Sequence, residues 1–480
     1  MNLQIRKLSL AMLVLFAVLV GGTSWWTVVK AKSTADNPLN RRPLLEEQQI
    51  PRGLILARNG TRLAVNKRQG SGETKRYFRS YPQDTLFSHA IGYEFISHGS
   101  AGIEKQFNSQ LQGQENEFKS IVDEFSGGTK AGDDIQTTLD PAAQRVAEQA
   151  LGPRKGAIVA LDPSTGRVRV MLSYPQYNPN LIPREFKTLN RDANAPLFNR
   201  ATQSGYPPGS TFKVVTAAAA LDTGQYTPDS QISGKNNKVI SGVPLQNFGG
   251  EDFSTISLTD ALTKSVNTVF GEIGEKLGKK TMYKYMRRFG FNQEPPLQYP
   301  SSQIAPSGVY NSRGRLLGPT DPVDIGRVAI GQERLKVTPL QMAMVAAAVA
   351  NGGKLMKPRL VEKVVDPDGR TVTNYGPQKE ATVMSAQAAG QLAQMMTNVV
   401  QSGTGTAAAL QGIKVAGKTG TAEVANGAAN QAWFIAFAPV DNPKVAIAVT
   451  VERTTQSLTG GEVAAPIAKQ VMQTLLRENG

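Results

Sequence analysis

Ser210 and Lys213 form the pair of side chains in this sequence with the clearest chemical potential. They stand in the stretch Tyr-Pro-Pro-Gly-Ser-Thr-Phe-Lys (206–213), which precedes an apolar, alanine-rich run at 214–221. Proline is not tolerated inside a helix and Gly209 permits a tight turn, so the stretch predicts a buried helix that opens at Ser210. Lys213 then lies on the same helical face and can reach the Ser210 hydroxyl. The pattern predicts a nucleophile paired with a base at the positive end of a helix dipole.

The same two residues also fit an ordinary structural role, with Ser210 as a helix cap and Lys213 as a solvated side chain. Two further motifs favour the catalytic interpretation. Each of three motifs occurs once, in this order: Ser210-x-x-Lys213, Ser265-Val266-Asn267 and Lys418-Thr419-Gly420. This set and order are typical of penicillin-binding proteins and serine β-lactamases, and the sequence resembles that superfamily.

The composition excludes several other chemistries. The chain has 480 residues and no cysteine, which excludes a thiol nucleophile, a Cys-based metal site and a disulfide framework. Its two histidines, His89 and His98, stand in no recognised catalytic or metal-binding pattern, and we expect both to be ordinary loop residues. Elimination therefore points to lysine as the base, and we expect no cofactor or metal.

A long uncharged segment near the N-terminus predicts a membrane anchor. Residues 8–29 follow Arg6 and Lys7, and at about 1.5 Å per residue they can cross a bilayer of about 30 Å. Trp25 and Trp26 would then lie in the interfacial aromatic belt. The run exceeds the apolar part of a typical signal peptide, so a retained anchor is favoured over a cleaved signal. The net charge of +15 suits an anionic membrane or cell-wall surface, and no nucleic-acid motif is present.

The segment after the anchor predicts a non-catalytic module. Asn59-Gly60 between two short apolar runs predicts a hairpin. The stretch 52–64 also resembles the N-terminal signature of class B penicillin-binding proteins, although Ala57 stands where that signature usually has Asp. Gly102-Ile103-Glu104 resembles a second motif of the same module. The resemblance implies a small, mostly β pedestal or dimerisation-type domain, in a region too short for the glycosyltransferase domain of class A enzymes.

The chain as a whole predicts a mixed α/β (α+β) fold. We expect residues 1–32 to hold a cytoplasmic tip and the transmembrane anchor, 33–150 the pedestal, and 151–480 the catalytic domain. The predicted elements are a helix at 142–151 capped by Asp140, a hairpin at 156–162 and 167–173, helices at 259–264 and 268–277 around a break at 265–267, strands at 414–423, 432–438 and 444–451, and a closing helix at 461–477. Gly278 is expected to end the helix at 268–277. The resemblance implies an antiparallel sheet flanked by helices, with an all-helical subdomain.

The resemblance also implies a role for each catalytic residue. Ser210 would attack the substrate carbonyl. Lys213, its pKa lowered by burial and by the charge of Lys418, would act as a neutral base. Ser265 and Lys418 would pass the proton to the leaving amine, and Asn267 would bind the substrate amide.

Substrate binding is expected on the third motif. Thr419 and Thr421, with Lys418, would receive the terminal carboxylate of a peptide, and Gly420 would let the substrate backbone lie against the strand. The backbone amides of Ser210 and Thr421 are the oxyanion hole that the resemblance implies.

These features predict a class B penicillin-binding protein, most similar to the actinobacterial penicillin-binding protein A group. Such an enzyme is a peptidoglycan D,D-transpeptidase, which cross-links stem peptides through a serine acyl-enzyme, releases D-Ala and is inhibited by β-lactams. Expected partners are stem peptides or their lipid-linked precursor, a membrane glycan polymerase, and division or elongation proteins. We expect one membrane pass with the catalytic domain outside the cytoplasm. The alternatives are a non-catalytic scaffold and a serine β-lactamase, although no Glu-x-x-x-Asn of the class A type lies between Ser265 and Lys418.

Overall fold

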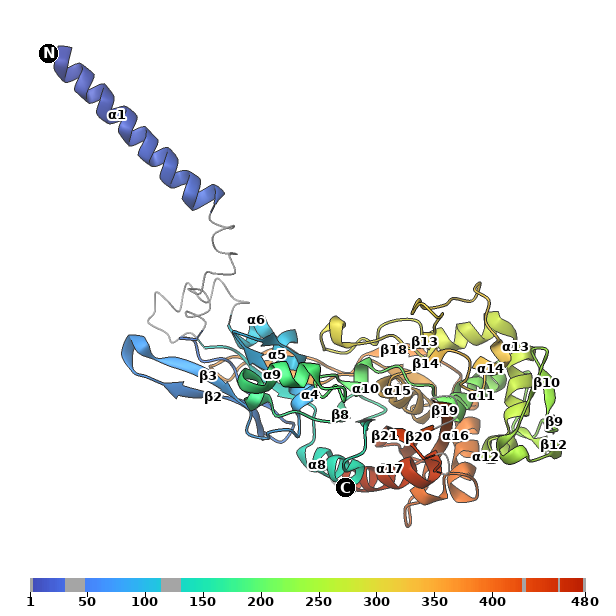
Figure 1. The fold of residues 1–480 in the computed structure, drawn as a ribbon. Coiled ribbons are helices and arrows are strands. Elements are labelled where there is room, and N and C mark those ends of the chain that lie inside the picture. Colours follow the sequence, from blue (N-terminus) through green and yellow to red (C-terminus); the bar gives the residue numbers. More distant parts are fainter. Residues whose placement is uncertain (1–2, 31–47, 114–130, 425–428, 456–457, 478–480) are drawn as a thin grey trace. The chain divides into compact units, whose positions relative to one another are not determined.

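The computed structural model describes residues 3–30, 48–113, 131–424, 429–455 and 458–477 (Figure 1). The chain divides into two compact units, one of residues 1–51 with 67–78 and one of residues 52–66 with 79–480.

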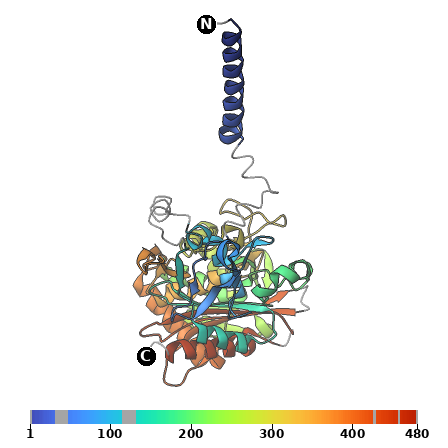
Figure 2. The ribbon, with the colours of Figure 1, turned by 90° about the vertical axis from the view of Figure 1, so that its left-hand side faces the viewer.

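The first unit contains helix α1 (Leu3–Ser24), which continues into a π-helical turn at Trp25–Val29 (Figure 2). The span Gln4–Val28 is long and apolar enough to cross a membrane. Thr23 and Thr27 donate their hydroxyls to carbonyls one turn earlier in the same helix, at 2.9 and 2.8 Å. These two hydroxyls are therefore satisfied within the helix, without water, which suits the predicted anchor.

A six-stranded sheet gathers strands from two distant parts of the chain. Its strand order is β17 (Thr371–Asn374), β16 (Val361–Val365), β6 (Asp134–Thr137), β1 (Ile55–Leu56), β2 (Arg62–Gln69) and β3 (Arg76–Ser80). The predicted hairpin around Asn59-Gly60 is confirmed by the antiparallel pairing of β1 with β2. The sheet expected within residues 33–150 is thus completed by strands at 361–374, and the division into 33–150 and 151–480 stays a prediction.

The two histidines lie in a stretch of short helices and strands. These elements are α4 (Ser88–Ile91), β4 (Glu94–Phe95), β5 (Gly99–Ser100), α5 (Gly102–Gln106) and α6 (Asn108–Leu111). His98 lies in the turn between β4 and β5, as expected. The expectation is wrong for His89, which is buried in α4 with Nε2 2.8 Å from the Pro196 carbonyl. Burial lowers the pKa of His89 to about 4, so it packs as a neutral core residue.

A buried charge cluster stabilises the same region. Glu104 is fully buried, and its carboxylate accepts hydrogen bonds from Arg52 Nε at 2.8 Å and Arg79 Nε at 2.5 Å. The Tyr81 hydroxyl adds a third at 3.3 Å. Burial alone would raise the pKa of Glu104, but the two guanidinium groups outweigh it and lower the pKa below its ordinary value.

A five-stranded antiparallel sheet forms the core of the C-terminal part. Its order is β19 (Ala416–Val424), β20 (Ala429–Ala438), β21 (Val445–Thr454), β7 (Gly156–Leu161) and β8 (Val168–Tyr174), which confirms the predicted strands and hairpin. Alternate residues of β7 enter different cores: Ile158 packs with α8 (Pro141–Leu151) and α17 (Gly460–Arg477), whereas Val159 packs with the helices opposite (Figure 1). Helices therefore cover both faces of the sheet, which explains why the inner strand β7 is apolar along its whole length.

The helices on the second face form the predicted helical subdomain. They are α11 (Lys213–Asp222), α12 (Leu258–Thr263), α13 (Asn267–Arg288), α14 (Ile325–Val328), α15 (Pro339–Ala350) and α16 (Ala386–Gln401). Between α11 and α12 the chain adds two small antiparallel strand pairs. β9 (Gln231–Gly234) pairs with β12 (Phe253–Ser257), and the hairpin of β10 (Lys238–Ile240) and β11 (Val243–Leu245) lies between them in sequence. Further short elements are α9 (Ile182–Arg191), α10 (Arg200–Gln203) and the pairs β13 (Gly308–Val309) with β14 (Leu335–Lys336) and β15 (Lys354–Met356) with β18 (Lys379–Thr382).

Helix boundaries follow the local sequence. Asp140 caps α8 by accepting from the Ala142 and Ala143 amides, as predicted. Gly278 ends the helix that begins at Asn267, as predicted, because its φ of 74° and ψ of 161° are not helical. A second helix follows across this kink and runs to Arg288 with buried side chains such as Met282, so the label α13 covers both parts.

Substituting Glu104→Ala should strongly destabilise the protein. The change leaves two buried guanidinium groups without their carboxylate, which costs about 3–5 kcal/mol in the free energy of unfolding. Chemical denaturation measures the loss. Asp441→Ala is the control, because its pair with Lys414 is exposed and is worth about 0–1 kcal/mol. Equal effects of the two substitutions would contradict a structural role for the cluster.

Candidate active site

Ser210 stands in a 3-10 turn, η4 (Gly209–Phe212), that leads directly into α11. The predicted helix is thus confirmed, with its first turn tightened. Gly209 has a φ of 52°, and its amide donates to the Gly331 carbonyl at 3.1 Å. Thr211 and Phe212 are buried, so they anchor the turn while Ser210 itself stays half-buried.

Lys213 is fully buried and points at the second motif. Its Nζ donates to the Ser265 carbonyl at 2.6 Å and to Asn267 Oδ1 at 2.7 Å, and it lies 3.3 Å from Ser265 Oγ. Within the described residues its hydrogen bonds do not include the Ser210 hydroxyl. The Lys213–Ser210 contact therefore stays a prediction.

The second motif occupies the break between α12 and α13. Ser265 has a φ of 61°, and the reversal places its hydroxyl and the Asn267 amide on the side of Lys213. Val266, between them, is buried in the core, as expected. A left-handed conformation at a non-glycine residue costs about 1–3 kcal/mol, and the surrounding helices must hold it.

Lys418 joins the same cluster from β19, which is an edge strand of the five-stranded sheet. It is fully buried, and its Nζ donates to Ser265 Oγ at 2.9 Å and to the Thr419 carbonyl at 3.1 Å. The Ser265 hydroxyl therefore lies between two lysine amines. An edge strand is also the position that the predicted substrate pairing requires.

Both lysines have lowered pKa values. Burial, together with the charge of Lys418, lowers the pKa of Lys213 well below its ordinary value. Burial lowers the pKa of Lys418 to about 7. Protonation of either amine thus costs more in the folded chain than in the unfolded chain, so these groups add stability as the pH rises from the lowered pKa towards 10.5.

Two residues that the motifs did not reveal hold the threonines of the third motif. Thr404 Oγ1 lies 2.6 Å from Thr419 Oγ1, and the Gly460 amide donates to Thr421 Oγ1 at 3.2 Å. Thr404 stands in an ordinary Gly-Thr-Gly loop and Gly460 begins α17, so no local signal marks either one.

Gly420 allows β19 to approach the Ser210 turn. A Cβ at this position would lie 2.7 Å from the Pro208 carbonyl oxygen and 2.9 Å from Thr211 Cγ2. Trp433 on the neighbouring strand donates Nε1 to the Pro207 carbonyl at 3.0 Å. The glycine is therefore required by packing within the protein, whatever it does for the substrate.

Within the described ranges, no group of three or more His, Asp or Glu side chains is placed to hold a metal ion. The residues that the sequence singled out instead form one lysine-serine-asparagine cluster, contributed by Lys213, Ser265, Asn267 and Lys418.

This fold is that of a penicillin-binding protein transpeptidase domain, as the comparison with known families shows. Residues 156–473 match the penicillin binding protein transpeptidase domain, and residues 52–135 match the penicillin binding protein A dimerisation domain. The chain belongs to the penicillin-binding protein transpeptidase family.

Individual relatives cover the whole chain. Peptidoglycan D,D-transpeptidase PbpA of Mycolicibacterium smegmatis is 35% identical over 100% of both chains. PbpA of Mycobacterium tuberculosis is 33% identical over 99% of each. A ceftriaxone acyl-enzyme complex of penicillin-binding protein A from M. tuberculosis superposes with a TM-score of 0.82 at 34% identity, covering 90% of this chain and 100% of that one.

Substituting Gly420→Ala should slow acylation by a fluorescent penicillin by roughly tenfold to a hundredfold, because the methyl group forces β19 away from the Ser210 turn. Gly390→Ala in α16 is the matched control, since a Cβ there meets no atom within 4 Å and alanine favours a helix by about 0.5–1 kcal/mol. A parental acylation rate in Gly420→Ala would show that the close approach is unimportant.

Proposed function

We propose that this chain is a peptidoglycan D,D-transpeptidase. In this proposal Ser210 forms the acyl-enzyme, D-Ala leaves, and the acyl group passes to an amine of a neighbouring stem peptide. The observation that carries the proposal is the Ser265 hydroxyl held between two buried lysine amines with lowered pKa values, beside the turn that bears Ser210.

The first half-reaction is the attack of Ser210 Oγ on the carbonyl of the penultimate residue. Neutral Lys213 takes the Ser210 proton, and the backbone amides of Ser210 and Thr421 stabilise the oxyanion. Removing one such donor typically costs about a hundredfold to a thousandfold in rate. The C–N bond then breaks, and Ser265, in contact with both lysines, delivers a proton to the departing amine.

The second half-reaction runs the same steps in reverse. The acceptor amine attacks the ester, its proton returns through Ser265 and the lysines, and Ser210 regains its own proton as the C–O bond breaks. Substrate recognition rests on Lys418, Thr419 and Thr421 as partners of the terminal carboxylate. The Gly460 amide supports this role for Thr421, because a hydroxyl oxygen that already accepts a hydrogen bond points its own proton elsewhere.

We also propose the cellular setting. The apolar helix α1 would be a retained single-pass anchor in the cell membrane, with the remainder of the chain outside the cytoplasm. A glycan polymerase in the same membrane would supply the strands whose stem peptides this enzyme cross-links. Division or elongation proteins would be further partners. β-Lactams would acylate Ser210 as substrate mimics. The structure of the M. tuberculosis relative is such an acyl-enzyme complex, formed with ceftriaxone.

Intact-protein mass tests the proposed nucleophile. The detergent-solubilised full chain, mixed with benzylpenicillin, should gain the mass of one drug molecule, and Ser210→Ala should gain none, because it lacks the attacking oxygen. No adduct with the drug intact would favour a scaffold, and no adduct with the drug consumed would favour a β-lactamase.

The pH dependence tests the proposed base. The acylation rate should rise with pH well below the ordinary lysine pKa of 10.5, because the charged amine of Lys213 cannot accept a proton and the neutral amine can. Lys213→Arg should acylate roughly a hundredfold or more slowly and show no such rise, since guanidinium stays charged. Lys213→Met is the control for volume, because it removes the base without burying a larger cation. A parental rate in Lys213→Arg would exclude this mechanism.

A further inference from the structure

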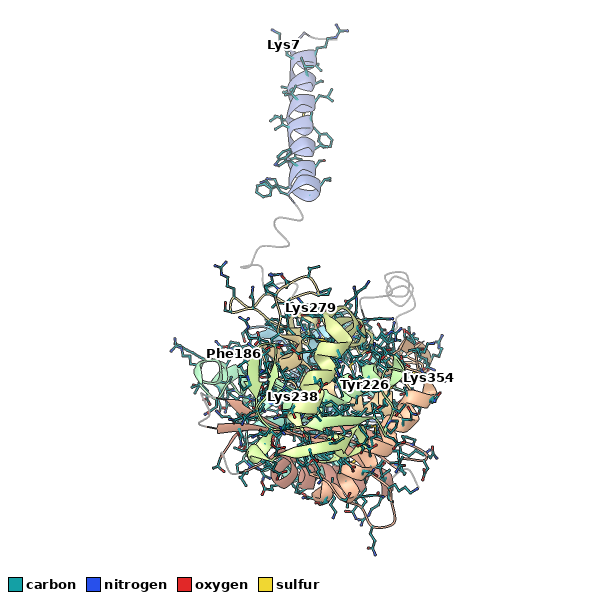
Figure 3. All side chains as sticks on the ribbon, turned by 90° about the vertical axis from the view of Figure 1, so that its right-hand side faces the viewer. Lys7, Phe186, Tyr226, Lys238, Lys279 and Lys354 are labelled. Carbon is teal, nitrogen blue, oxygen red and sulfur yellow. The ribbon has the colours of Figure 1, made fainter. Side chains whose placement is uncertain are left out.

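The loop after β11 docks on the first turn of α13, directly beside the second motif. The Gln246 carbonyl accepts from Asn267 Nδ2 at 2.9 Å, and Asn247 Oδ1 accepts from the Thr268 amide at 3.0 Å. Two consecutive loop residues thus bind two consecutive helix residues. On the adjacent strand β10, Lys238 pairs with Glu272 further along α13, and Figure 3 labels this lysine.

Asn247 holds this loop together. It is only 4% exposed, and its Nδ2 donates to the Gly234 carbonyl at 2.9 Å and to the Glu251 carbonyl at 3.0 Å. Its backbone amide donates to Asn236 Oδ1 at 2.9 Å. One side chain therefore joins the end of β9, the loop before β12 and the start of α13. Asparagine alone supplies one acceptor and two donors at this length, because aspartate lacks the donors and serine lacks the reach.

The loop determines which way the Asn267 amide faces. Asn267 Oδ1 accepts from Lys213 Nζ at 2.7 Å, while its Nδ2 donates to the Gln246 carbonyl. The flipped amide would place its NH₂ against the lysine donor and its oxygen against a carbonyl. The contact of the flipped oxygen with the carbonyl is repulsive whatever the charge of Lys213, so the Gln246 carbonyl selects the orientation that presents oxygen to Lys213.

We propose that Asn247 is a positioning residue for the transpeptidase reaction: it fixes the Gln246 carbonyl on Asn267 and thereby holds Asn267 Oδ1 on Lys213. The inference rests on the proposed role of Lys213 as base. The charged group that faces Lys213 from the opposite side is Lys418 of β19, and the Phe270 ring lies 5.7 Å from Nζ. Among its described contacts the Asn267 and Ser265 oxygens are the groups that orient the amine.

The experiment compares Asn247→Ala with the parent in the full chain. Benzylpenicillin acylation, followed by intact mass, should be roughly tenfold to a hundredfold slower at its pH plateau, because the amine is no longer held. The rise of the rate with pH should also move to lower pH, since an oxygen that stabilised the charged amine has withdrawn. Loss of folded protein alone would lower the acylation rate at every pH, but it would not change the pH at which the rate rises. Asn247→Asp keeps the acceptor for the Thr268 amide, so its acylation rate should lie between those of the parent and Asn247→Ala.

Asn199→Ala is the matched control. Asn199 is also a buried asparagine that caps a helix, α10, and it touches no residue of the three motifs. It should lower the melting temperature without moving the pH profile. An unchanged profile and plateau in Asn247→Ala, or the same shift in Asn199→Ala, would overturn the proposal.

Hydrogen exchange separates this proposal from the proposed function. Amides of residues 265–270 should exchange faster in Asn247→Ala and at the parental rate in Asn199→Ala, whether or not penicillin reacts. Unchanged exchange in Asn247→Ala would overturn the docking role. A parent that exchanges as expected but is never acylated would instead count against the enzyme function.

Discussion

Two buried lysines that share one serine hydroxyl are the constraint on which the rest of the site depends. Lys213 and Lys418 are both fully buried, and each lies within hydrogen-bonding distance of Ser265 Oγ. Burial lowers the pKa values of both amines, and the charge of Lys418 lowers that of Lys213 further, so the doubly protonated state is disfavoured. A proton that leaves one amine has the Ser265 hydroxyl as its neighbour, and this is the arrangement that a proton relay requires.

The backbone packs very closely around the Ser210 turn and β19. The Ser210 turn lies against Gly331, which follows α14, and β19 lies against the start of α17, with glycines at both contacts. A Cβ on Gly331 would lie 2.0 Å from the Gly209 carbonyl oxygen, and a Cβ on Gly460 would lie 2.3 Å from that of Gly420. Backbone contacts of this kind leave little freedom for relative movement, because neither partner can change rotamer to give way. The precision of the lysine cluster is thus supplied mainly by residues that have no side chain.

Local patterns predicted the parts of this structure that local forces determine. The alanine-rich run of α11, the capped start of α8 and the β-branched or aromatic residues of β20 and β21 each carry their own propensity, and all these elements were predicted close to their true bounds. The three motifs also identified the members of the lysine-serine-asparagine cluster, although their roles stay predictions. Tertiary contacts were not predictable in the same way. Burial of His89, the addition of β16 and β17 to a sheet formed by the N-terminal part, and the bonds of Thr404 and Asn247 all join segments far apart in sequence.

Two of the buried charge clusters in the described part of the chain show how stability and chemistry require opposite arrangements. In the N-terminal cluster a carboxylate, Glu104, lies between two guanidinium groups, so every charge has a counter-charge and the pKa of the acid falls. The described hydrogen-bond partners of Lys213 and Lys418 are instead all neutral oxygens. A carboxylate beside either amine would stabilise its charged form and keep it protonated, which removes the base. Neutral acceptors orient the amines without fixing their charge, and the proposed role of Lys213 as base requires this, because a base must be able to lose its proton.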